Sequence, residues 1–174
     1  NELSEEAVLS ELSMLKKDEG LEDEMEILKS SPLMLAVVDS LQLQVRYFGL
    51  GRVKDAELYD NTPIRLVYDV ADVPKKMVFF LSAFEDDGFK LNIGQESTDT
   101  LKLQFDESFV HDGIGFQFQR TTDASLDQSY RVELSPREDM ARSLASKLEI
   151  NQVEWSNVIN ISQTDRSVQR GIDL

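Results

Sequence analysis

The single histidine is the residue best suited to acid–base chemistry, so it is the first candidate for a catalytic site. His111 stands between Val110 and Asp112, beside the turn signal Asp112-Gly113. A hydrolytic triad needs a histidine within hydrogen-bonding reach of a nucleophile, which in many hydrolases sits in a G-x-S-x-G elbow. The sequence contains no such elbow. We therefore interpret His111 as a surface-loop residue and predict no catalytic residue.

Clustered carboxylates offer two other kinds of chemistry, binding of a hard cation and glycoside hydrolysis. The segment Glu85-Asp86-Asp87-Gly88 lacks the D-x-D-x-D-G spacing of an EF-hand and separates two strand-like segments, so it favours a hairpin turn. The pairs Asp106-Glu107 and Asp123/Asp127 are interpreted as solvated loop charges. Because 33 of the residues are acidic, any two of them could lie close together by chance. We predict no metal site.

Glycine and cysteine patterns give no cofactor site either. Gly113-Ile114-Gly115 lacks the third glycine and the following helix of a dinucleotide-binding motif, and no P-loop lysine is present. We interpret it as part of a hairpin and predict no cofactor. The chain has no cysteine, which excludes disulfides, zinc–thiolate sites and thiol nucleophiles.

Aromatic side chains leave carbohydrate binding open as an alternative function. Phenylalanines alternate along several strand-like segments, at Phe79, Phe80, Phe84, Phe89, Phe105, Phe116 and Phe118. Most are expected in the core, but an exposed row would make a platform for sugar rings. Trp155 is interpreted as a half-buried side chain that covers part of the fold, rather than a residue that stacks on a ligand.

Charge and length narrow the classes of partner. The chain has 18 basic and 33 acidic residues, a net charge of −15, which argues against nucleic acid and against an anionic membrane surface as partners. A length of 174 residues suits one domain with a hydrophobic core. We expect residues 1–20 to form a loosely attached helix and residues 21–174 to form a single α+β domain.

Residues 21–48 organise the rest of the chain. A helix is predicted over residues 21–30, and a second helix restarts at Ser31-Pro32, with Ser31 as its cap. Met34, Val37, Val38 and Leu41 then follow at helical spacing, so this stripe is expected to pack on the sheet.

The middle of the chain predicts antiparallel strands and the end predicts helices. Strands are predicted at residues 43–48, 63–68, 76–84, 89–93, 100–105, 114–119, 130–134 and 158–161. The segment 76–84 is almost wholly apolar and is expected to be central. Ser135-Pro136-Arg137-Glu138 matches a capping box before a helix that carries Met140, Leu144 and Leu148. The predicted fold is α+β, a mostly antiparallel sheet with flanking helices, truncated at the start of a long helix after Thr164-Asp165.

Motifs at both ends of the chain resemble one family. The sequence D-E-M-E-I-L-K-S at residues 23–30 is followed by L-M-L-A-V-V-D-S-L-Q-L at 33–43, then by Tyr47-Phe48 and by Glu57-Leu58-Tyr59 ahead of Pro63. V-I-N-I-S-Q-T-D-R-S-V-Q-R-G-I-D-L at residues 158–174 supplies a second match. In this order the motifs resemble the polysaccharide co-polymerases, or chain-length determinant proteins, and above all the Bacteroidetes-type exopolysaccharide transport proteins.

The resemblance implies a function that residue chemistry alone does not. It implies a non-enzymatic periplasmic domain between two transmembrane helices of an inner-membrane protein, in some relatives fused to a cytoplasmic tyrosine kinase. Such proteins form homo-oligomers and regulate the chain length or export of capsular or exopolysaccharide. The implied partners are the polysaccharide polymerase or an outer-membrane export channel, and the polysaccharide itself. A carbohydrate-binding module is the alternative, and a carboxylate-based glycoside hydrolase is a third hypothesis.

Overall fold

Alternating apolar and polar residues build most of the chain into short strands, with helices near both ends. The computed structural model describes residues 22–59, 61–84, 88–95, 99–121, 126, 128–153, 156, 158–165 and 168–173. Its elements are a helical segment at 22–28, α2 (Ser31–Ser40), β1 (Val45–Leu50), β2 (Ala56–Leu58), β3 (Ile64–Tyr68), β4 (Met77–Ala83), β5 (Phe89–Ile93), β6 (Thr100–Leu103), β7 (Ser108–His111), β8 (Ile114–Arg120), β9 (Ser129–Leu134), α3 (Arg137–Lys147), β10 (Leu148–Gln152), β11 (Ile159–Gln163) and α4 (Val168–Asp173).

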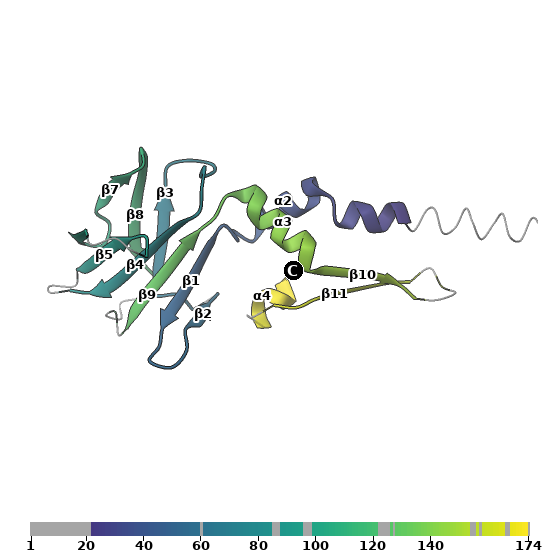
Figure 1. Cartoon of the computed structure of the whole chain (residues 1–174). Helices are drawn as coiled ribbons and strands as arrows, with labels where there is room; N and C mark the ends of the chain where they lie inside the picture. The colour runs from purple at the N-terminus through teal and green to yellow at the C-terminus, as the bar shows by residue number, and fades with distance from the viewer. Residues whose placement is uncertain are drawn as a thin grey trace, which may run out of the picture.

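Two antiparallel sheets form a sandwich at one end of the molecule (Figure 1). The larger sheet has the strand order β2-β1-β9-β4-β5-β6, and the smaller sheet has the order β3-β8-β7. Every strand pair is antiparallel in the part of the chain that is described. The predicted α+β class with mostly antiparallel sheet is confirmed, and β4 is central as expected. In the described residues the strands divide among three sheets, because β10 and β11 pair only with each other.

Phenylalanine side chains fill the space between the two sheets. Phe79 on β4 and Phe89 on β5 face Phe116 and Phe118 on β8, and all four are at most 1% exposed. Alternate residues of a strand point to opposite faces, so every second residue of these strands enters the core. The prediction that most phenylalanines are core residues is confirmed for these four. They cannot form an exposed platform for sugar rings.

The two long helices pack on each other beside the sandwich. Met34 and Val38 of α2 are buried against Ala141 and Leu144 of α3, in a cluster separate from the sandwich core. The prediction that the α2 stripe packs on the sheet is therefore wrong. Another amphipathic helix, α3, offers the stripe a matching apolar face nearer than the sheet does.

The helix starts are placed correctly, but their caps differ from the prediction. Pro32 lies in the first turn of α2, where its missing amide is tolerated, while the cap position is Ser30 and makes no side-chain bond. The predicted capping box at Ser135 is also wrong, since the cap position of α3 is Pro136. Instead, the Arg137 amide donates to Oδ1 of Asp72 at 2.9 Å, so a distant side chain satisfies the helix start.

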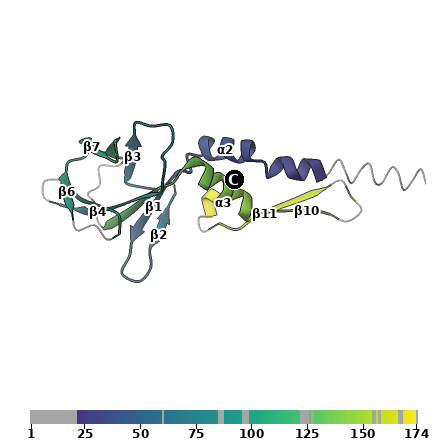
Figure 2. The same ribbon diagram turned by 45° about the horizontal axis from the view of Figure 1, so that its top comes forward.

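A two-stranded hairpin projects from the helical end of the molecule (Figure 2). Leu148, expected to continue the stripe of α3, instead begins β10, which pairs with β11. The helical segment 22–28 runs along this hairpin, and Met25 and Ile150 line the groove between them. Within the described residues, no helix is long and apolar enough to cross a membrane. The helix predicted at residues 1–20 lies outside the described residues.

Candidate functional site

A cleft lies where the sandwich meets the helical end. It has a volume of about 570 Å³. One wall comes from the link between α2 and β1, including Gln42 and Gln44, and the opposite wall comes from β3, including Arg65. The floor includes Glu57 of β2 and Arg170 of α4. The cleft therefore joins segments from the beginning, middle and end of the chain.

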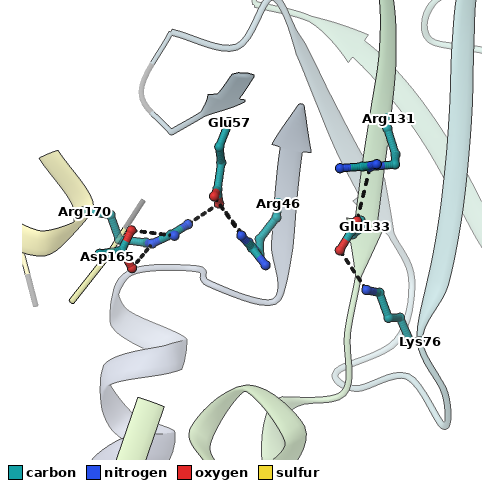
Figure 3. A network of polar contacts seen from close by, with 7 residues as sticks. All are labelled: Arg46, Glu57, Lys76, Arg131, Glu133, Asp165 and Arg170. Carbon is teal, nitrogen blue, oxygen red and sulfur yellow. Dashed lines mark hydrogen bonds and ion pairs between the residues drawn. The ribbon is translucent and has the colours of Figure 1, made fainter. Parts of the chain in front are cut away.

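A buried carboxylate holds the floor of this cleft together (Figure 3). Glu57 accepts hydrogen bonds from Nε and Nη2 of Arg46, at 2.8 and 2.7 Å, and from Nη1 of Arg170. Arg170 also donates to both carboxylate oxygens of Asp165, at 2.9 and 2.6 Å. The side chains of Glu57, Asp165 and Arg170 are all less than 10% exposed. This cluster fastens α4 to the edge of the large sheet.

The cluster fixes the charge of Glu57. Burial raises the pKa of this carboxyl group, but the hydrogen bonds and positive charges of Arg46 and Arg170 outweigh it and lower the pKa from 4.5 to about 2. The carboxylates of Glu57 and Asp165 raise the pKa of Arg170, against the effect of burial. At neutral pH, the floor is a fully ionised network.

Two tyrosines on the cleft wall serve the fold through their hydroxyl groups. The Leu66 amide on the free edge of β3 donates to Oη of Tyr47 at 3.0 Å, which ties β3 to β1 across the two sheets. The Tyr68 hydroxyl donates to Oε1 of Gln44 at 3.3 Å. Burial raises the pKa of both tyrosines, with the nearby charges of Asp72 and Asp39 adding to the rise at Tyr68.

Tyr47→Phe is expected to destabilise the protein by about 1–2 kcal/mol, because the Leu66 amide loses its acceptor in a partly buried position. Urea denaturation at neutral pH measures the effect. Tyr68→Phe is the matched control, since its hydroxyl makes a longer bond at the cleft surface and is expected to cost about 0.5 kcal/mol. Equal losses from the two variants would show that the Tyr47 hydroxyl does not join the sheets.

Three ionisable groups of the cleft have pKa values far from neutrality. A general acid or base works best with a pKa near the operating pH. Glu57 titrates at about 2, and the pKa values of Tyr47 and Tyr68 are raised above 10. None of these three groups exchanges a proton readily near neutrality. Arg65 keeps a guanidinium group at the cleft surface, where it donates to Oε1 of Gln42 at 3.3 Å.

The residues considered for catalysis lie away from this cleft. His111 is the last residue of β7, and its Nε2 atom is 3.5 Å from the Asp112 carboxylate in the following turn. Lys75 also pairs with Asp112 at 2.7 Å and is the main cause of that carboxyl group's lowered pKa. Asp112 and Gly113 both have positive φ, 53° and 78°, which gives the tight turn of a hairpin. The hairpin predicted at Gly113 is confirmed.

The other acidic candidates are turn residues or lie outside the description. Asp106 has a φ of 66°, and Glu107 accepts the amide of Gln104 at 2.8 Å, so this pair shapes the loop before β7. Residues 85–87, Asp123, Asp127 and Trp155 lie outside the described residues. Among the residues that are described, no group of three or more potential ligands is arranged to hold a metal ion.

Sequence analysis did not identify the residues of the buried cluster as partners. Arg46, Glu57 and Arg170 look like surface charges in the sequence, and Glu57 and Arg170 are 113 residues apart. The available signal is that Glu57, Asp165 and Arg170 lie in motifs of the family resemblance. No protein-family model matches the sequence, and no curated protein matches it significantly.

Proposed function

We propose that this chain is a non-enzymatic periplasmic domain of an inner-membrane protein that regulates the chain length or export of capsular or exopolysaccharide. The full-length protein would act as a homo-oligomer, with the polysaccharide polymerase or an outer-membrane export channel as its partner. The proposal rests on the family resemblance of the end segments. The structure adds one supporting observation about where those segments lie.

The segments that carry the resemblance are contiguous in space. Glu57, from the Glu57-Leu58-Tyr59 motif, binds Arg170 in the C-terminal motif. Tyr59 packs against the α2–α3 cluster, which contains Met34 and Val38 of the N-terminal motif. Unrelated chance matches would have no reason to meet at one end of the molecule. Their contact supports the view that the motifs belong to one structural unit shared with the family.

A carbohydrate-binding module is the second candidate, and the cleft is the observation that favours it. Planar amides and tyrosine rings line the cleft, and Gln42, Gln44 and Arg65 bring hydrogen-bonding groups to its surface. Sugar sites typically combine such groups in a concave surface. The buried phenylalanines favour no such function. If this candidate holds, the polysaccharide would occupy the cleft.

Deleting the gene in its native strain tests the first candidate. We expect the length distribution of the surface polysaccharide on a gel to change, or the polymer to disappear from the surface, and the full-length gene to restore it. Restoration should also occur with Glu138→Gln, because this glutamate is 74% exposed and its ion-pair partner, Arg142, does not belong to the Glu57 cluster. An unchanged polymer after deletion would contradict the proposal. Calorimetric binding of the purified polysaccharide by this chain, with unchanged polymer length, would favour the second candidate.

A further inference from the structure

The hairpin β10–β11 stands alone as a sheet. In the described part of the chain no third strand pairs with it, and it extends away from the sandwich (Figure 1). A two-stranded ribbon is only marginally stable by itself in water. One face carries the three isoleucines of the hairpin, where Ile150 pairs with Ile161 and Gln152 pairs with Ile159. Ile150 is buried beside Met25, whereas Ile161 remains 51% exposed.

The hydrogen bonds within the hairpin show which backbone groups remain outside. The Val153 amide donates to the Val158 carbonyl at 2.9 Å, which makes this a hydrogen-bonded pair. Such pairs alternate along an antiparallel ladder, so Asn160 and Ser162 also bond inward to β10. It follows that Ile159, Ile161 and Gln163 direct their amide and carbonyl groups to the outer edge of β11.

Three other edge strands, β2, β6 and β3, carry protection that β11 lacks. The edge strand β2 has only three residues, and β6 carries Lys102. On β3, the Leu66 amide is bound by Tyr47 and the Ile64 carbonyl accepts from the Thr62 hydroxyl at 2.8 Å. Short length, lysine and capped backbone groups are the usual means of preventing strand addition. β11 has the sequence INISQ, with no charge, proline or glycine.

We propose that the outer edge of β11 pairs antiparallel with β11 of a second copy of this chain, about a twofold axis at Ile161. Ile161 then faces Ile161 of the second copy, and Ile159 faces Gln163, so all three outward-directed residues are matched. The result is a four-stranded sheet, β10-β11-β11-β10. A twofold contact closes at two copies. It is therefore separate from any ring-forming contact that the proposed function requires, and it does not depend on that function.

A second copy of this chain fits the edge of β11 better than a charged partner does, because β11 has no charged side chain for such a partner to bind. The protein carries −15, so most surfaces of two copies repel each other. Within β11 no charged side chain is brought opposite another, and the exposed Ile161 side chains cover each other. The faces of the two hairpins that carry the isoleucines also become continuous. Pairing of β11 with itself thus stabilises both ribbons at a strand that carries no charged side chain.

Sedimentation velocity over a rising series of concentrations tests the proposal. We expect the weight-average mass of the chain to increase from 19.8 kDa towards twice that value. Ile161→Pro is the sharpest variant, because it removes only an outward amide and leaves the bonds to β10 intact. It is expected to abolish the increase in mass. Ile161→Lys should do the same by placing two ammonium groups opposite each other.

The matched control is Val110→Lys on β7, another edge strand of the sandwich. Val110 is 74% exposed, and the substitution is expected to leave self-association unchanged. Because the chain has no cysteine, Ile161→Cys adds a single thiol, and oxidation should then link two copies by a disulfide. Circular dichroism verifies that each variant is folded. A chain that stays monomeric at every concentration, or a folded Ile161→Pro that still dimerises, would overturn the proposal.

Discussion

Replacing Phe79 with alanine is expected to lower the free energy of unfolding by about 3–5 kcal/mol. Phe79 is fully buried, and its ring lies 5.3 Å from that of Phe116, 5.8 Å from Phe118 and 6.4 Å from Phe109, all edge to face. Removing the ring leaves a cavity between the two sheets and deletes three favourable aromatic contacts. Urea denaturation followed by circular dichroism measures the loss.

The neighbouring residue provides a control with the same chemistry. Phe80 follows Phe79 on β4, but it points to the outer face of the large sheet and is only partly buried. Phe80→Ala is expected to cost about 1 kcal/mol. Equal losses at the two positions would mean that the strand does not present alternate residues to a sandwich core.

Glu57→Gln is expected to destabilise the protein by about 3 kcal/mol, because Arg46 and Arg170 lose the carboxylate that compensates their buried charge. The value lies at the low end of the usual range for a broken buried ion pair, since Arg170 retains Asp165. The loss should be concentrated at the junction, so hydrogen exchange in α4 should increase more than exchange in β4. Urea denaturation gives the total effect.

The stabilisation by Glu57 depends on pH in a defined direction. The pKa of the carboxyl group is about 2 in the folded protein and 4.5 ordinarily, so the folded state favours the ionised form. Its contribution is therefore complete above the unfolded pKa and disappears as the pH falls from about 4.5 towards about 2. The Glu57→Gln variant should lose less stability than the native chain over this interval.

Two comparisons isolate the effect of the buried cluster. Glu138→Gln removes an exposed glutamate that pairs with Arg142, and it is expected to change stability by less than about 0.5 kcal/mol. A double-mutant cycle of Glu57→Gln with Arg170→Met should give a coupling energy of about 1–3 kcal/mol. Additive effects would show that the two side chains do not interact in solution.

Strand positions were predictable because local alternation determines them. Residues 89–93 coincide with β5, and residues 63–68 differ from β3 by one residue. β2, β7 and β10 were missed. β2 and β7 are only three and four residues long, and β10 begins directly after α3, where the stripe of Met140, Leu144 and Leu148 predicts a continued helix.

The division of the sandwich strands into two sheets was not predictable from these patterns. Alternation shows that a residue such as Phe118 is buried but does not indicate which sheet its strand joins. Pairing is decided by contacts between distant segments, such as β1 with β9 and β3 with β8. The same limit applies to the helix starts, since Asp72 caps α3 from 65 residues away.

The candidate site was the least predictable part. A histidine or a carboxylate cluster attracts attention in the sequence because of its residue types. The Glu57 cluster consists of ordinary charged residues. It is distinguished by the burial of Glu57 and Arg170 where β1, β2 and α4 meet. Only the tertiary structure brings these residues together.

The pairing of β1 with β9 has a consequence for how this protein can vary. The chain enters the sandwich at Val45 and leaves it at Leu134, and these two residues are direct partners across adjacent strands. Both ends of the sandwich thus lie side by side, next to the helices α2 and α3. Segments whose ends are close together can be inserted, lengthened or removed with little disturbance to their host. The sandwich has the geometry of an insert, and its size can change through evolution while the helical end is retained.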